Sequence, residues 1–548
     1  MKWKNRILAI PVVLFLVLYT PVLFLVVFFG NKVDYYEIYK LDTLMPNVLL
    51  AAIAAGIIFA LFFVYRLVSM IPDNKYTHIG MVVFAFVFCV VFYNVKIFVA
   101  KNIAFLGGWD CGIVANTARG IDSGVNINDT YNSYFQLFPF NVPIVWLMNR
   151  LYRLAGNIRN YPYYQEFIWM QFQSAMYAIS VFFSAMTGLL MSKRIRDSVL
   201  ILAVCGTILG FTPWNVIPYT DGFGIAFPIS IIFFGALFMN AGKIWQKGIC
   251  SFLLALVSFA GYLIKPSTII ALIAVFIILA MEFIYTHNKG KWRVGSCVIC
   301  FICGIVMGIV IKYSISESLG YVQEKNRGAA LSTYFITGTT KETSGAYIGD
   351  AFELISRYGN EHTLSERKHA EIAKALNNLG SMGFFGAVEF FTQKMVMTMN
   401  DGTFCWYNEG IFVAYNYPEI SGSSLKWVLR NIYWDDGSAY RKFNTLSQLL
   451  WIFVQLGVFL CFLTEMTRLL RVKRGDNAVK YMLMIAILGL YMYILLFEAR
   501  ARYILVFLPV FATAGAVGTT ELFIDIDRFI TEHIKLKVHE QGKLSKKA

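Results

Sequence analysis

The sequence predicts an all-α polytopic membrane protein with about twelve transmembrane helices and two long extracytoplasmic loops. Of its 548 residues, 58% are hydrophobic and only 15% are charged, and the mean hydropathy is +0.59. Apolar stretches of the roughly 20 residues that a helix needs to cross a bilayer recur along almost the whole chain. Alternating ten-residue segments, which are typical of an outer-membrane barrel, are not seen.

The first predicted span covers residues 7–30 and follows Lys2, Lys4 and Arg6. It is too long for a signal-peptide core and no small-residue cleavage site follows it, so we expect an uncleaved helix with a cytoplasmic N-terminus. Further spans are predicted at residues 45–66, 79–100, 166–191, 198–214, 221–240, 249–265, 267–286, 295–313, 445–465, 481–498 and 503–519. An even number of spans returns the C-terminus to the cytoplasm.

The charge distribution tests this topology independently. A net charge of +15 would suggest a nucleic-acid partner in a soluble protein. Here the Lys and Arg residues gather in short loops between apolar runs, such as 193–196 and 289–293, which is the positive-inside pattern. The first outer loop instead carries Asp34, Glu37 and Asp42 against only Lys32 and Lys40. We therefore expect a multi-pass plasma-membrane protein with both termini in the cytoplasm and no nucleic-acid partner.

Two connections are longer than compact packing requires, and long loops on one face commonly carry function. The predicted organisation is N-terminal transmembrane helices at 1–100, a first extracytoplasmic loop at 101–165, transmembrane helices at 166–313, a large extracytoplasmic subdomain at 314–444, C-terminal transmembrane helices at 445–519 and a basic cytoplasmic tail at 520–548. Apolar periodicity predicts a helix over 364–379 in the large loop.

Two aspartates are predicted at the extracytoplasmic surface. Asp110 follows the third span and a Gly-Gly pair, and Asp221 follows a turn rich in Pro and Gly. A partly desolvated carboxylate suits a general base that activates an acceptor hydroxyl. Either residue could instead cap a helix, with Thr220 as a rival cap in the second case. Two carboxylates at a similar depth favour a shared site.

Cations are predicted on the same face. Lys265 ends a span before Pro266, while Glu498, Arg500 and Arg502 separate two strongly apolar runs. Ionisable residues beside hydrocarbon indicate function, and the planar fork of arginine suits a phosphate. The alternative is a structural pair between Glu498 and Arg502, four residues apart.

The large loop adds a further cation, Arg327, and a segment rich in aromatic and polar residues that contains Asp401, Trp406 and Glu409. Aromatic rings beside Asp and Glu suit sugars, which have apolar faces and hydroxyl rims. Aromatic residues at an interface also anchor membrane proteins, and the pattern leaves both interpretations open.

Together, Trp109-Asp110, Tyr219-Thr220-Asp221, Lys265-Pro266 and the segment from Glu498 to Pro509 resemble the GT-C superfamily, polytopic glycosyltransferases that use polyprenyl-phosphate sugars. The chain looks most similar to uncharacterised Gram-positive bacterial members. The resemblance implies a GT-C-like fold, with Asp110 as the general base, Asp221 as a second acidic site and Arg500 or Arg502 on the donor phosphate. Two features depart from the family: Asp110 follows a third span rather than the first, and no second carboxylate stands directly beside it.

The resulting hypothesis is an inverting glycosyltransferase that moves a sugar from a polyprenyl-phosphate donor to an extracytoplasmic glycan, lipid or protein acceptor. Its predicted catalytic residues are Asp110 and Asp221, its predicted phosphate-binding residues are Arg500, Arg502, Lys265 and Arg327, and its predicted sugar- or acceptor-binding residues are Trp109, Tyr219, Asp401, Trp406 and Glu409. No cofactor is expected, and no residue pattern indicates a divalent metal, although the resemblance is compatible with one. Membrane lipids are expected partners. The alternatives are a transporter or lipid-linked-sugar flippase and a non-catalytic envelope assembly protein.

Overall fold

The regular structure of the chain is helical throughout the part that the structure describes, which confirms the predicted all-α class. This computed structural model describes residues 2–30, 41–103, 108–130, 133–156, 165–285, 291–358, 362–406, 424–470 and 477–544.

Within these residues, ten helical segments are long and apolar enough to cross a membrane. They are formed by α1 (Lys2–Phe29), α2 (Asn47–Val68), α3 (Lys75–Ile103), α7 (Gln165–Ser192), α9 (Thr220–Gly224) with α10 (Phe227–Asn240), α11 (Ile244–Ile264), η5 (Pro266–Thr268) with α12 (Ile269–Tyr285), α13 (Lys291–Ser318), α19 (Tyr440–Leu470) and α20 (Ala478–Leu496).

Two predicted spans do not meet this criterion. The span predicted at 198–214 corresponds to α8 (Ile195–Phe211), which has only 17 residues because the chain turns extended at Thr212, before Pro213. The span predicted at 503–519 corresponds to α21 (Arg502–Leu505) and the apolar beginning of α22 (Leu508–Leu544). Ten spans are therefore supported by length and composition, and a total of twelve remains a prediction.

The core of the bundle is formed where α19 and α22 cross. A side chain at Gly457 would lie 2.4 Å from the Gly515 carbonyl oxygen, and one at Gly518 would lie 2.0 Å from the Gly457 carbonyl oxygen. Small residues at a crossing let two membrane helices approach closely and gain van der Waals contact. Phe15 and Trp451 are fully buried beside these helices: Phe15 stacks on Phe462 of α19, and Trp451 packs against Phe511 of α22.

Helices at the edge of the bundle bury only one face. In α3, Met81, Ala85 and Cys89 are buried at a spacing of four residues, while Phe84 and Val91 are more than half exposed. This exposed apolar face is what a membrane helix presents to lipid, since lipid chains are as apolar as the side chains themselves.

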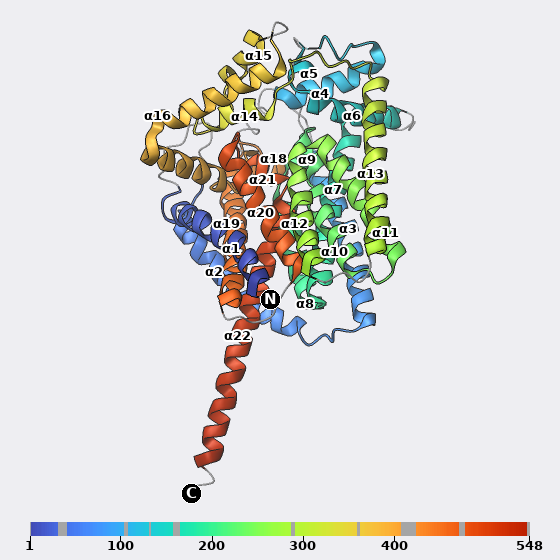
Figure 1. The fold of residues 1–548 in the computed structure, drawn as a ribbon. Coiled ribbons are helices and arrows are strands. Elements are labelled where there is room, and N and C mark those ends of the chain that lie inside the picture. Colours follow the sequence, from blue (N-terminus) through green and yellow to red (C-terminus); the bar gives the residue numbers. More distant parts are fainter. Residues whose placement is uncertain are drawn as a thin grey trace.

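The two long connections form a helical layer at one end of the bundle, opposite the end where the N-terminus and the projecting part of α22 lie (Figure 1). We name these the loop end and the terminal end. The layer contains α4 (Trp109–Gly120), η2 (Ile121–Ser123), α5 (Tyr134–Leu137), η3 (Pro139–Asn141), α6 (Val142–Gly156), α14 (Leu331–Gly338), η6 (Gly349–Phe352), α15 (Glu353–Tyr358), α16 (Leu364–Met399) and α18 (Ser424–Tyr433).

The helix expected over 364–379 is present but extends much further, to Met399, because α16 continues through a kink. Gly383 has φ of 63° and ψ of 178° at this kink, a backbone conformation that is essentially restricted to glycine. The kink turns the second half of α16 back toward the bundle, where it packs against α1 and α20 (Figure 1).

Candidate functional site

The first part of the site is an irregular turn at the loop end, between α8 and α10. After α8 ends, the chain forms η4 (Trp214–Val216) and then α9, and this turn carries Tyr219 and Asp221. The Gln173 side chain of α7 donates to the Ile217 carbonyl at 2.8 Å. A side chain at Gly222 would lie 1.7 Å from the Gln173 amide oxygen and would displace this buried amide. The turn is thus fixed against α7.

Asp110 faces this turn from the other side. Its Oδ2 accepts a hydrogen bond from the Tyr219 hydroxyl at 3.2 Å, and its carboxylate also accepts one from Tyr134 of α5. The Asn141 amide in turn donates to the Tyr134 hydroxyl at 2.8 Å. Burial and the negative charge of Asp110 raise the pKa of Tyr134, so the phenol stays protonated and remains a donor. Two phenols therefore orient one half-buried carboxylate.

Neither aspartate occupies the capping position that the sequence left open. Helix α4 begins at Trp109 with Gly108 as its N-cap, and α9 begins at Thr220 with Tyr219 as its N-cap. Asp110 and Asp221 lie one residue inside their helices, and neither cap residue makes a side-chain capping bond.

Asp221 has a different environment from Asp110. It is fully buried, and its Oδ1 lies 2.7 Å from the Lys265 ammonium, which also lies 3.4 Å from the Thr220 hydroxyl. Lys265 itself keeps only 14% of its side chain exposed. A buried carboxylate paired in this way balances the charge of the lysine and fixes its position. Asp221 thus holds Lys265 in the site.

A second cation completes the group. The Arg502 guanidinium lies 4.7 Å from the centre of the Trp109 ring and 5.5 Å from that of Tyr219. The Lys265 ammonium lies 6.0 Å from the same Tyr219 ring and 5.0 Å from the Tyr503 ring. These distances are within the range of cation–π attraction. Tyr219 therefore connects the carboxylate of Asp110 to both cations.

The segment between α20 and α21 supplies the remaining charges. Glu498 accepts a hydrogen bond from the Tyr503 hydroxyl at 2.6 Å and lies 3.6 Å from the Arg500 guanidinium. Residues 497–501 are not helical, so Glu498 and Arg502 are not one helical turn apart as the structural-pair alternative assumed. Arg500 stacks at 5.9 Å over Tyr347 of the large loop.

Seven of the eleven predicted site residues come together at the loop end, as described above: Asp110, Asp221, Lys265, Trp109, Tyr219, Arg500 and Arg502. Arg327 is instead half exposed and lies 3.0 Å from Glu324. Glu409 lies outside the described residues.

Asp401 and Trp406 stabilise a turn beside the site rather than facing open space. Asp401 accepts hydrogen bonds from the Thr403 amide at 2.8 Å and the Cys405 amide at 2.6 Å, and the Trp406 indole donates to the Tyr433 carbonyl at 2.7 Å. The Cys405 thiol is hydrogen-bonded to the Arg502 backbone. This turn therefore packs against the backbone of Arg502.

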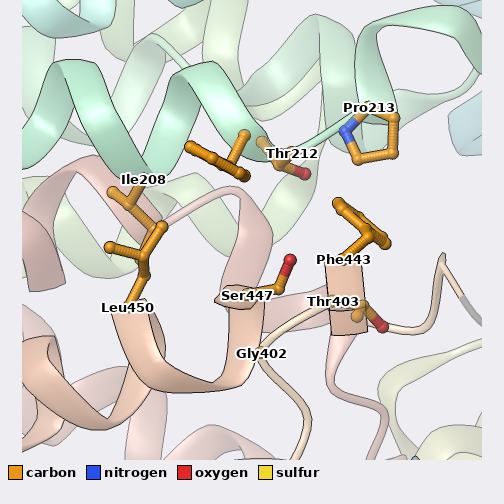
Figure 2. Close-up of a pocket in the computed structure, with 9 residues that line it drawn as sticks. Ile208, Thr212, Pro213, Gly402, Thr403, Phe443, Ser447 and Leu450 are labelled. Carbon is orange, nitrogen blue, oxygen red and sulfur yellow. The ribbon is translucent and has the colours of Figure 1, made fainter. Parts of the chain in front are cut away.

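A small pocket lies next to this turn (Figure 2). It is bounded by the end of α8 at Thr212 and Pro213, by Thr403, and by Phe443 and Ser447 of α19. Its lining includes none of the charged residues of the site. The pocket thus reflects loose packing behind the Asp401 turn and is separate from the Asp110 group.

Three residues of the site went unrecognised in the sequence. Tyr503 directly follows Arg502, so its place in the charged motif could have indicated it. Tyr134 and Asn141 belong to a long loop with no spacing signal, and only the fold brings them to Asp110. Among the described residues, no three His, Cys, Asp or Glu side chains gather in a way that could hold a metal ion.

Comparison with protein families adds one finding. Residues 1–521 match a family described as "conserved hypothetical integral membrane protein". The chain belongs to this family. No curated protein matches it. Membership of this integral membrane protein family, with ten helices suited to crossing a bilayer, makes the chain a multi-pass membrane protein.

Proposed function

We propose that this integral membrane protein is a glycosyltransferase that moves a sugar from a polyprenyl-phosphate donor to a hydroxyl acceptor at the extracytoplasmic surface. One observation carries the proposal. Tyr219 bonds the Asp110 carboxylate through its hydroxyl and contacts both Arg502 and Lys265 through its ring. A proton acceptor and two cations thus surround one tyrosine side chain, an arrangement that would suit the transfer of a sugar from a phosphate.

In the proposed reaction, the acceptor oxygen attacks the anomeric carbon of the donor. The bond between that carbon and the phosphate oxygen breaks, and its electron pair stays on the leaving phosphate. Arg502 and Lys265 stabilise the charge that develops there. Asp110 takes the proton from the acceptor hydroxyl. A single displacement inverts the configuration at the anomeric carbon and releases polyprenyl phosphate.

The neighbouring groups support these assignments. Trp109 and Tyr219 form an edge-to-face pair with ring centres 4.9 Å apart, and they offer apolar surface beside Asp110. Asp221 is fully buried against Lys265, so we assign it to positioning that cation rather than to proton transfer. A lipid-linked donor reaches such a site by diffusing within the membrane, which makes a nucleotide-binding domain unnecessary.

The test uses the full-length protein in nanodiscs with a panel of polyprenyl-phosphate sugars. We expect at least one donor to release free polyprenyl phosphate, and Asp110→Asn to abolish most of that release. Asp122→Asn is the matched control, because Asp122 lies in the same loop but pairs with Arg153 at the surface. Transbilayer movement of the intact donor without release would contradict the proposal and favour a flippase.

A further inference from the structure

The non-helical segment 497–501 is held by the large loop. The Ala499 amide donates to the Gly345 carbonyl at 2.8 Å. A side chain at Gly338, the last residue of α14, would lie 2.4 Å from the Leu496 carbonyl oxygen and 2.5 Å from the Phe497 carbonyl carbon. Two backbones therefore meet directly, and the segment that carries Glu498 and Arg500 rests on the loop subdomain.

Lys394 of α16 completes this contact. Its ammonium donates to the carbonyls of Gly338 at 2.6 Å, Leu495 at 3.0 Å and Phe497 at 2.7 Å. Two of these carbonyls belong to the C-terminal turns of α14 and α20, and the third belongs to the C-cap of α20. Carbonyls at a helix C-terminus lack intrahelical donors and attract a positive charge.

The match between donor and acceptors is complete, since a protonated lysine has three N–H groups and here it meets three carbonyls. Lys394 is fully buried, and Gly345, with φ of 77°, leaves room for its chain: a side chain there would lie 2.8 Å from Lys394 Cε. A buried lysine costs desolvation, and an apolar residue would serve simple packing at lower cost.

We propose that Lys394 is a positioning residue that joins the large loop to the phosphate-binding segment, so that Arg500 and Arg502 keep the geometry in which they meet a lipid phosphate. This inference rests on the proposed function for the identity of the ligand. It assigns a role to the loop subdomain: its α14 and α16 hold the cationic segment in place from outside the membrane bundle.

The experiment measures binding of polyprenyl phosphate, the product lipid, to the full chain in nanodiscs. Lys394→Met keeps the length of the side chain and removes the charge. We expect it to weaken binding about tenfold, because residues 495–502 lose the hydrogen bonds that hold Arg500 and Arg502 in position. Hydrogen exchange should also increase in the peptide that covers residues 495–502. Lys368→Met is the matched control, since Lys368 is an exposed lysine on the same helix. If Lys394→Met does not fold, Lys394→Gln keeps two N–H donors and should give a smaller loss.

The outcomes separate the two proposals. Unchanged binding and exchange in a folded Lys394 variant, with binding lost in Arg502→Ala, would overturn the role of Lys394 and leave the phosphate site intact. Unchanged binding in both variants would overturn the phosphate site itself. Increased exchange at 495–502 together with weaker lipid binding supports the inference.

Discussion

At the scale of single residues, Asp110 is the position where the proposed chemistry is easiest to isolate. Asn keeps a side-chain oxygen that can accept from Tyr219 and Tyr134 but cannot take a proton. We therefore expect Asp110→Asn to fold with nearly unchanged thermal stability and to lose activity by about 10²- to 10⁴-fold, the usual effect of removing a general base. Sugar transfer and thermal unfolding would be measured on the same preparation. Retention of most of the activity would assign Asp110 a structural role.

Substitution of Arg502 tests the proposed contact with the phosphate of the sugar donor. Loss of one charge-assisted contact to phosphate commonly costs about 1.5 to 3 kcal/mol, so Arg502→Ala should weaken donor use by roughly ten- to a hundredfold. Arg327→Ala is the comparison, because Arg327 pairs with Glu324 at the surface and should change donor kinetics by less than about twofold. Equal effects of the two substitutions would show that the measured loss reflects general surface charge.

The burial of Lys394 predicts that lipid affinity and folding stability depend on pH. Burial lowers its pKa to about 7, with Glu498 acting in the opposite direction, while burial keeps Tyr334 of α14 neutral by raising its pKa. As pH rises above about 7, Lys394 loses its proton and one of its three N–H donors, so affinity for polyprenyl phosphate should fall. The unfolded chain holds this proton up to about pH 10, so folding stability should rise with pH over the same window.

Lipid affinity and folding stability should therefore change in opposite directions as pH rises. Lipid affinity and unfolding temperature would be followed between pH 6.5 and 9, and Lys394→Met should remove the pH dependence of both. A parallel fall of affinity in wild type and variant would assign the effect to another group.

Only some residues of the site can be recognised from the sequence. Charged residues beside apolar runs are conspicuous, so Asp110, Lys265 and Arg502 could be named in advance. Their pairing could not, because it depends on how the turn at Tyr219 meets α4. The role of Lys394 could not be predicted for a different reason: its partners are backbone carbonyls, which every sequence contains.

At the scale of elements, a buried ionic network joins α19, α20 and α22. The Lys480 ammonium lies 2.7 Å from Glu465 and 2.6 Å from Glu521, and Arg468 lies 2.6 Å from Glu521. Tyr481 donates to Glu465 at 2.6 Å. Two cations thus balance two carboxylates, and the network ties three helices together.

We expect Lys480→Met to destabilise the protein by about 3 to 5 kcal/mol, because removing one partner leaves buried carboxylates uncompensated. Arg441→Met is the matched control: its pair with Asp42 is more than half exposed, and exposed pairs contribute about 0 to 1 kcal/mol. Denaturant unfolding of both variants in the same detergent would compare them. Similar losses would mean that the network is solvated.

The same scale shows what hydropathy can predict. Long apolar runs gave most helices to within a few residues, as for α2 and α20, because the bilayer fixes their length and composition. Shorter features depend on local breaks instead. Thr212-Pro213 shortens α8, and Gly383 lets α16 continue past a kink, so neither boundary follows from apolar content.

At the scale of the whole molecule, the loop end and the terminal end should face opposite compartments. Ser123 and Ser365 are exposed at the loop end, whereas Lys243 is exposed in the short α10–α11 connection. Each would be replaced by cysteine in a variant that has no other cysteine. An impermeant thiol reagent on intact cells should label the first two and leave the third unlabelled until the membrane is opened. The reverse pattern would invert the orientation and remove the basis for an extracytoplasmic reaction.

The short length of α8 makes the depth of the Tyr219 turn dependent on the thickness of the bilayer. Its 17 residues span only about 25 Å at 1.5 Å per residue, less than the roughly 30 Å of a typical hydrocarbon core. If α8 crosses the bilayer as the sequence predicts, with Arg194 and Arg196 at the surface of the terminal end, the turn that holds Tyr219 and Asp221 lies below the headgroup level of the other surface. Hydrophobic mismatch would then control the proposed reaction, since lipids with longer acyl chains would bury the turn more deeply and slow the arrival of a water-borne acceptor.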